Sequence, residues 1–167
     1  MLTKKSLKYL FIIILIACPW AGIIISSCSE DTDCSMAGRA MLQCNVYAHE
    51  DGTLVKVALT QLTVTAFDTD SIIINAQTNA QNISLPLRYT QETTVFVLHY
   101  GDNEEMKDTI TIRHDNISHF ISLECGYDMQ QSVADVAYTR HVLDSLSVKN
   151  ININMNGQEN VQLFYKN

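Results

Sequence analysis

The 167-residue chain carries 18 acidic and 11 basic residues, which gives a net charge of −7 at neutral pH. This acidic balance argues against nucleic acids and anionic lipid headgroups as partners, because phosphate contacts need a basic patch. The length suits a single domain behind a short leader.

The N-terminus has the pattern of an export signal. Three lysines lie within the first eight residues, and an apolar run follows over residues 9–25. A basic start followed by an apolar segment and small residues is typical of secretory signals. A retained transmembrane anchor is the alternative, but it needs about 20 apolar residues, and this run is shorter and contains Pro19. We expect residues 1–27 to be a signal peptide.

Residues 25–28, Ile-Ser-Ser-Cys, resemble a bacterial lipobox. The resemblance implies cleavage before Cys28, a thioether lipid on its sulfur and an acyl chain such as palmitate on its new amine. Such chains anchor firmly, because each buried methylene contributes about 0.8 kcal/mol. Cys18 also follows a lipobox-like triplet, but cleavage there would leave an apolar mature N-terminus. The polar residues behind Cys28 therefore favour lipidation of Cys28.

The segment behind Cys28 is acidic, with three acids among residues 29–33. It resembles the signal that directs Bacteroidetes-type lipoproteins to the cell surface. A solvated tether is the alternative, since acidic runs are usually disordered. We expect a lipid-anchored outer-membrane protein, at the periplasmic face or the cell surface, with residues 28–38 as the tether. Removal of residues 1–27 leaves 140 residues and changes the net charge from −7 to −10, because three lysines and no acids are lost.

Three cysteines besides Cys28 remain in the mature chain. Leu42, Cys44 and Val46 alternate with polar residues, which places Cys44 on the apolar face of a strand. Cys34 lies in the tether and Cys125 ends a predicted strand, so a bridge between them would clip the tether to the domain in an oxidising compartment. Free thiols are the alternative, because sequence does not fix connectivity. No C-x-x-C motif accompanies these cysteines, so we expect no zinc site and no cofactor.

Apolar and polar residues alternate with period two along the rest of the chain. The clearest runs lie at residues 62–66, 83–87, 109–113, 121–125, 150–156 and 161–165. Turn residues separate them at positions 51–52, 102–103, 115–116 and 156–157. One apolar and one polar face per strand is typical of antiparallel sheets. We expect residues 39–167 to form an all-β domain, an antiparallel immunoglobulin-like β-sandwich.

Three segments depart from simple alternation. Residues 94–100 are apolar on both faces, which predicts a central strand. Pro86 cannot donate a hydrogen bond to a neighbouring strand, so its strand is expected at an edge or a bulge. Residues 128–146 are predicted as a strand followed by a loop. A helix is the alternative there, because Asp128 with Gln131 resembles a capping box.

No catalytic motif occurs in the sequence: it contains no G-x-S-x-G, no H-E-x-x-H and no phosphate-binding glycine loop. We therefore expect no catalytic residue and no metal site. Ser71, Thr109 and Ser145 each follow an aspartate and precede an apolar residue, which resembles a Bacteroidetes-type O-glycosylation sequon. Turn chemistry is the alternative, since Asp and Ser bond to their own backbone at loop exits.

Several segments together resemble an uncharacterised family of Bacteroidetes-type lipoproteins, classed as a domain of unknown function. They are Cys28 with its acidic tail, Cys34, Ser-Leu-Pro-Leu at residues 84–87, the strands at 108–113 and 120–123, and Cys-Gly-Tyr at 125–127. The resemblance implies a single envelope β-domain and favours Cys34 with Cys125 as the bridged pair. It supplies no activity.

The sequence indicates a binding role and does not point to a particular reaction. We expect a non-enzymatic outer-membrane lipoprotein that acts as an envelope accessory or binding module for another outer-membrane protein. A surface module for glycans or host ligands is one alternative, although the only tryptophan, Trp20, leaves with the signal. A hydrolase is the alternative from another class, because its carboxylates need only meet in space.

Overall fold

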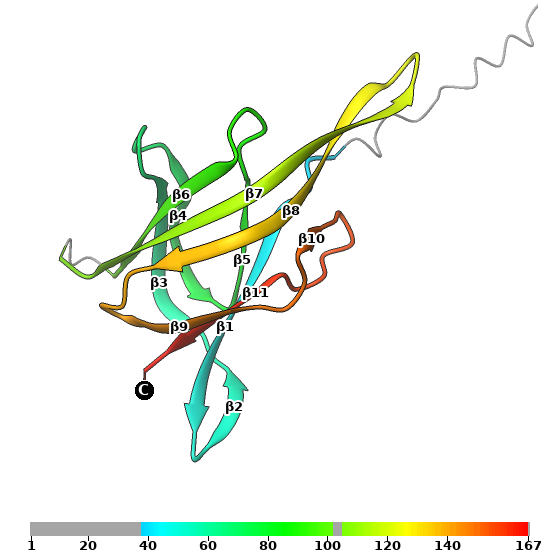
Figure 1. Ribbon diagram of the computed structural model, residues 1–167. Helices are drawn as coiled ribbons and strands as arrows, with labels where there is room; N and C mark the ends of the chain where they lie inside the picture. Colours follow the sequence, from blue (N-terminus) through cyan, green and yellow to red (C-terminus); the bar gives the residue numbers. More distant parts are fainter. Residues whose placement is uncertain (1–37, 102–104, 167) are drawn as a thin grey trace, which may run out of the picture. The chain divides into compact units, whose positions relative to one another are not determined.

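The computed structural model describes residues 38–101 and 105–166. Within these residues the chain forms eleven strands and no helix (Figure 1). Accordingly, no described segment is a helix that could cross a membrane. The signal peptide, Cys28, Cys34 and the turn predicted at residues 102–103 lie outside the described residues.

The first sheet is built around β1 (Leu42–Glu50). One edge of β1 pairs with β11 (Val161–Tyr165), which in turn pairs with β9 (Leu143–Val148). The other edge pairs with β5 (Asn82–Leu85) along its first half and with β2 (Thr53–Lys56) along its second half. The β1–β11 pair is parallel, which departs from the wholly antiparallel arrangement that we expected.

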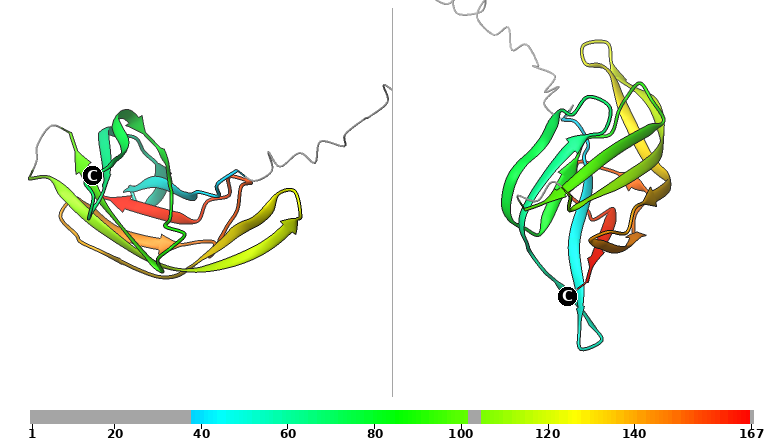
Figure 2. Two further views of the ribbon diagram at one scale, coloured as in Figure 1. Left: turned by 90° about the horizontal axis from the view of Figure 1, so that it is seen from above. Right: turned by 90° about the vertical axis from the view of Figure 1, so that its left-hand side faces the viewer.

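The second sheet has six antiparallel strands. Their order is β10 (Asn152–Ile153), β8 (Gly126–Tyr138), β7 (Lys107–Ser122), β6 (Thr93–Tyr100), β3 (Leu59–Ala66) and β4 (Ile72–Ala80). β6 pairs with β7 only as far as Arg113, whereas β8 follows β7 to its end. Residues 117–130 therefore leave the sheet as a two-stranded hairpin, here called the arm, which projects from the domain (Figures 1 and 2).

The two sheets enclose one apolar core, so the fold is the expected β-sandwich (Figure 2). The largest fully buried apolar side chains are Leu42, Leu62, Ile83, Leu85, Leu87, Phe96, Leu98, Ile110, Ile112, Leu143 and Leu163. Apart from Leu87, which lies in the loop after β5, they occupy strand positions, and Leu62, Ile83, Leu85, Phe96, Leu98, Ile110 and Ile112 follow the alternation that the sequence pattern predicts. Cys44 lies among them as a free thiol, and burial, with a smaller contribution from Glu159, raises its pKa to about 12.

Most predicted elements are confirmed. β6 lies between β3 and β7, as expected for a strand that is apolar on both faces. Residues 126–138 form β8, so the helical alternative is wrong. The loop predicted up to residue 146 ends earlier, because β9 begins at Leu143. β5 ends at Leu85, directly before Pro86. Asp51 and Gly52, with φ angles of 50° and 78°, make the two-residue turn between β1 and β2.

The turn predicted at residues 115–116 is wrong. β7 continues through both residues, with a register shift between Arg113 and His114. Asn116 does not use its side chain to close a local turn, because that amide binds the carbonyls of a distant loop, residues 88–91. Tertiary hydrogen bonds have therefore overridden the local preference of Asp-Asn for a turn.

Candidate functional site

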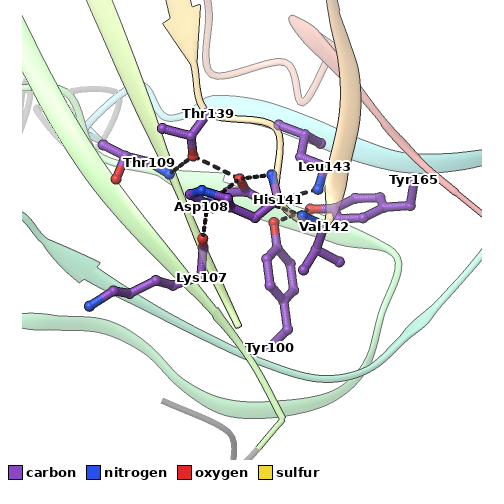
Figure 3. Close-up of polar contacts among 9 residues, drawn as sticks. All are labelled: Tyr100, Lys107, Asp108, Thr109, Thr139, His141, Val142, Leu143 and Tyr165. Carbon is purple, nitrogen blue, oxygen red and sulfur yellow. Dashed lines mark hydrogen bonds and ion pairs between the residues drawn. The ribbon is translucent and has the colours of Figure 1, made fainter. Parts of the chain in front are cut away.

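Asp108 is the only buried carboxylate among residues 38–101 and 105–166 (Figure 3). Its oxygens accept hydrogen bonds from the backbone N–H groups of His141, Val142 and Leu143 at 2.7–2.9 Å. The hydroxyl of Thr139 donates another at 2.7 Å. These donors lie on the loop that crosses from β8 in one sheet to β9 in the other and on the first residue of β9, so the carboxylate fixes the crossover.

The protonation state of Asp108 follows from these contacts. Burial raises the pKa of the carboxyl, but the four hydrogen bonds together outweigh burial and bring the pKa below its usual range. Asp108 is therefore a stable anion whose acceptor sites are occupied by the fold. Tyr100 and Tyr165 lie beside it with their hydroxyl oxygens 3.1 Å apart, and burial raises the pKa of each phenol. These contacts stabilise the crossover between the two sheets.

Sequence reasoning missed this cluster. The signal was present, because Asp108 shares the inward face of β7 with Ile110 and Ile112 and is the only acid on that apolar face. A charged residue at an inward strand position is rarely buried unless it is paired or hydrogen-bonded. That rule would have predicted partners for Asp108 without naming them.

His114 is a second buried polar group with a structural role. Its Nε2 lies 2.8 Å from the Thr94 hydroxyl, and its Nδ1 lies 3.1 Å from the Asn116 Oδ1 atom. Gln131 donates to the same Oδ1 atom at 2.7 Å, while the Asn116 amide nitrogen binds carbonyls of residues 88–91. Burial lowers the pKa of His114, which favours the neutral ring. The network holds the loop between β5 and β6 against the base of the arm.

Three surface hollows of the domain have volumes of about 300, 250 and 320 Å³. Among the described residues, the first hollow contains one carboxylate, Asp128, the second contains Asp135, and the third contains none. A carboxylate pair of the kind that hydrolyses glycosides is therefore not found among the described residues that line these three hollows. Within the described parts of the chain, no group of three or more His, Cys, Asp or Glu side chains could hold a metal ion.

The second hollow, here called the edge groove, lies where the sandwich is open. It is lined by Val133, Ala134, Asp135, Val136, Tyr138, Leu146, Val148 and Ile151. On this side β9 is the last strand of its sheet, and β10 pairs only with Gln131 and Ser132 of β8. Two strand edges with few strand partners among the described residues therefore flank an apolar groove.

Register shows that the edge groove is an uncovered part of the core. Val136 lies opposite Ile112, and Leu146 lies opposite Leu163. Because both partners are fully buried, Val136 and Leu146 also point towards the interior of the sandwich. Both nevertheless stay partly exposed, since no strand between β8 and β9 covers them.

The arm is apolar and exposed. Its exposed large apolar side chains are Ile117, Phe120, Ile121, Leu123 and Tyr127. Leu123 is 91% exposed and Tyr127 is 71% exposed. The strand predicted over residues 121–125 is wrong from Leu123 onwards, because residues 123–125 form the turn at the tip.

Cys125 lies in this turn, and its N–H donates to the Ser122 hydroxyl at 3.0 Å. Because Cys34 lies outside the described residues, the Cys34–Cys125 bridge stays a prediction. The candidate glycosylation residues are scattered: Ser71 is exposed before β4, whereas Thr109 in β7 and Ser145 in β9 are partly buried. Their modification also stays a prediction.

Residues 61–165 match the family of unknown function DUF6452. The chain belongs to this family. The DUF6452 match runs from β3 to β11 and thus contains the edge groove, the arm and the Asp108 cluster. It confirms the resemblance to a domain of unknown function, while the lipoprotein character remains a prediction. Comparison with curated proteins and with solved structures finds no match.

Proposed function

We propose that this DUF6452 protein is a non-enzymatic envelope lipoprotein that binds another outer-membrane protein. Cys28 carries the lipid, residues 29–38 form the tether, and the sandwich is the binding module. The observation that carries the proposal is the edge groove, where apolar side chains and strand edges lie together. The buried acid Asp108 and the buried His114 are both engaged in holding the fold, which supports a binding function over catalysis.

The edge groove favours one kind of occupant, an extended segment of a partner protein. An incoming strand can pair with the edge of β9 through its backbone and place alternate side chains on the core. Val136, Tyr138 and Leu146 supply the apolar floor for those side chains. The mature charge of −10 further favours a partner with a basic surface near its extended segment.

The experiment places a photo-crosslinking residue at Val148 of the full chain in the native envelope. Val148 lines the edge groove and is 37% exposed, so the change does not open the core. Ile72, an exposed residue of β4 at the other end of the six-stranded sheet, is the matched control position. We expect one outer-membrane protein to crosslink from position 148 and not from position 72.

A second pair of variants links that adduct to the groove. Val148→Lys introduces a charge beside the apolar floor and should lower recovery of the crosslinked partner at least tenfold, whereas Ile72→Lys should leave it unchanged. A tenfold loss corresponds to about 1.4 kcal/mol of binding free energy. Equal crosslinking from both positions, or no adduct from either, would contradict the proposal.

A further inference from the structure

We propose that the tip of the arm is a membrane contact that rests in the headgroup region of a lipid bilayer of low net charge. This inference rests on the proposed lipid anchor at Cys28, and it concerns a surface separate from the edge groove. Two observations carry it: the distribution of apolar side chains on the arm, and the position of residues 38–40 at the base of the arm.

The apolar side chains of the arm cover both of its faces. Phe120 lies directly opposite Tyr127, and their rings meet edge to face with centroids 5.3 Å apart. Ile117 and Ile121 occupy positions that alternate with Phe120 and so lie on the other face. Leu123 lies at the very tip. A lipid interface can surround the tip and so cover apolar side chains on both faces.

The charge of the arm identifies the kind of lipid surface. Residues 117–130 contain no lysine or arginine, and their acids are Glu124 and Asp128. Attraction to anionic headgroups needs basic residues near the surface. The arm lacks them, whereas a tyrosine and a phenylalanine suit an interface that is apolar on one side and wet on the other. A zwitterionic surface is therefore the better fit.

Residues 38–40 lie at the base of the arm. A Cβ atom on Gly38 would lie 3.2 Å from the Met155 sulfur, and Ala40 lines the same hollow as Asp128, Met129 and Met155. A lipid on Cys28 would be attached ten residues before Gly38.

Chain length makes a shared membrane contact possible. Ten residues span at most about 35 Å, and the six residue-to-residue steps from Cys125 to Gln131 extend about 20 Å along the arm. The tether therefore allows the anchor and the tip to meet the same bilayer. Tethering also raises the effective concentration of the tip at the lipid surface, so a few side chains suffice.

The sequence provides a sensitive probe. The only tryptophan is Trp20, in the signal, so the mature protein contains none once residues 1–27 are removed. Leu123→Trp in the full-length lipoprotein then places one fluorophore at the tip, at a position too exposed to disturb the fold. Leu54→Trp is the matched control, because Leu54 is exposed on β2, and the β1–β2 hairpin projects away from the arm (Figure 1).

Each lipoprotein is reconstituted into phosphatidylcholine vesicles, with and without bromine on the acyl chains. We expect the emission of Trp at position 123 to shift to shorter wavelength and to lose intensity in the brominated vesicles. Emission from position 54 should stay unshifted and unquenched. If the emission from position 123 of a lipidated protein is not quenched, the membrane contact of the arm is overturned, while the proposed function is not. The same holds for a blue shift without quenching, which would mean that protein covers the tip.

Wild-type protein distinguishes this failure from failure of the proposed function. If its mass shows no lipid on Cys28, or if Trp20 emission persists, the anchor is absent and both proposals fall. If the wild-type protein is lipidated and shows no tryptophan emission, but the emission from position 123 of the variant is not quenched, the anchored binding module is retained and the membrane contact of the arm is rejected.

Discussion

Asp108 shows how one side chain can hold two sheets together. Its carboxylate binds three consecutive backbone N–H groups of the β8–β9 loop and the Thr139 hydroxyl. In Asp108→Asn an amide group replaces one acceptor oxygen and leaves buried donors without a partner. We expect the free energy of unfolding at pH 7 to fall by roughly 3 kcal/mol, measured by urea denaturation. The surface variant Asp144→Asn should change it by no more than about 0.5 kcal/mol.

Asp108 is also expected to make the stability of the protein depend on pH. The pKa of Asp108 is lower in the folded protein than its ordinary value of 3.8. The carboxylate therefore contributes its full stability above that value, and the contribution is lost as pH falls through the folded pKa. The difference in stability between wild type and Asp108→Asn should accordingly shrink below about pH 4. A difference that stays constant down to the acid transition would mean that packing, and not charge, is responsible.

At the scale of elements, the arm is the part of the domain that the core does not need. None of the side chains between Ile117 and Gln130 is buried. Replacement of residues 118–129 by Asn-Gly would keep Asn116 and Gln131, which complete the His114 network. We expect the shortened protein to keep its far-ultraviolet circular dichroism and to unfold within about 1 kcal/mol of a full-length Cys125→Ser control. A much larger loss would show that the arm supports the fold.

The elements also show what a sequence pattern can and cannot predict. Alternation located β3, β5 and β11, because the side-chain period of a strand is a local property. The alternation pattern could not predict that the side chains at the end of β7 are exposed, since burial depends on which strands lie nearby. The parallel pairing of β1 with β11 joins residues more than a hundred positions apart, and no local signal encodes it.

The candidate site, too, could be predicted only in part. The sequence shows that Val136, Leu146 and Val148 are apolar, but their exposure depends on the gap between β8 and β9. Likewise, Asp108 appeared in the sequence as part of a glycosylation-like triplet, whereas the structure gives its carboxylate a role in the crossover. Partners far away in sequence decide the role of a polar residue, so the pattern suggests candidates and the fold selects among them.

At the scale of the whole molecule, the number of free thiols tests both the lipid anchor and the disulfide bridge. If residues 1–27 are removed, the mature chain contains Cys28, Cys34, Cys44 and Cys125. A thioether on Cys28 and a Cys34–Cys125 bridge would leave Cys44 as the single thiol. Burial, which raises the pKa of Cys44 to about 12, keeps that thiol protonated and shielded in the folded protein.

Thiol titration of the unreduced lipoprotein therefore has a definite expected result. We expect no reactive thiol in the folded protein, one after denaturation in urea, and three after denaturation with reductant, because the thioether resists reduction. Three thiols before reduction would exclude the bridge and leave the thioether intact. A fourth thiol after reduction would exclude lipidation of Cys28. The variant Cys28→Ala tests lipidation separately: it should abolish metabolic labelling with palmitate, whereas Cys18→Ala should leave the labelling unchanged.

The bridge also has a predicted effect on stability. Because it closes a long loop, it should contribute up to about 4 kcal/mol, so reductant alone should lower the unfolding midpoint.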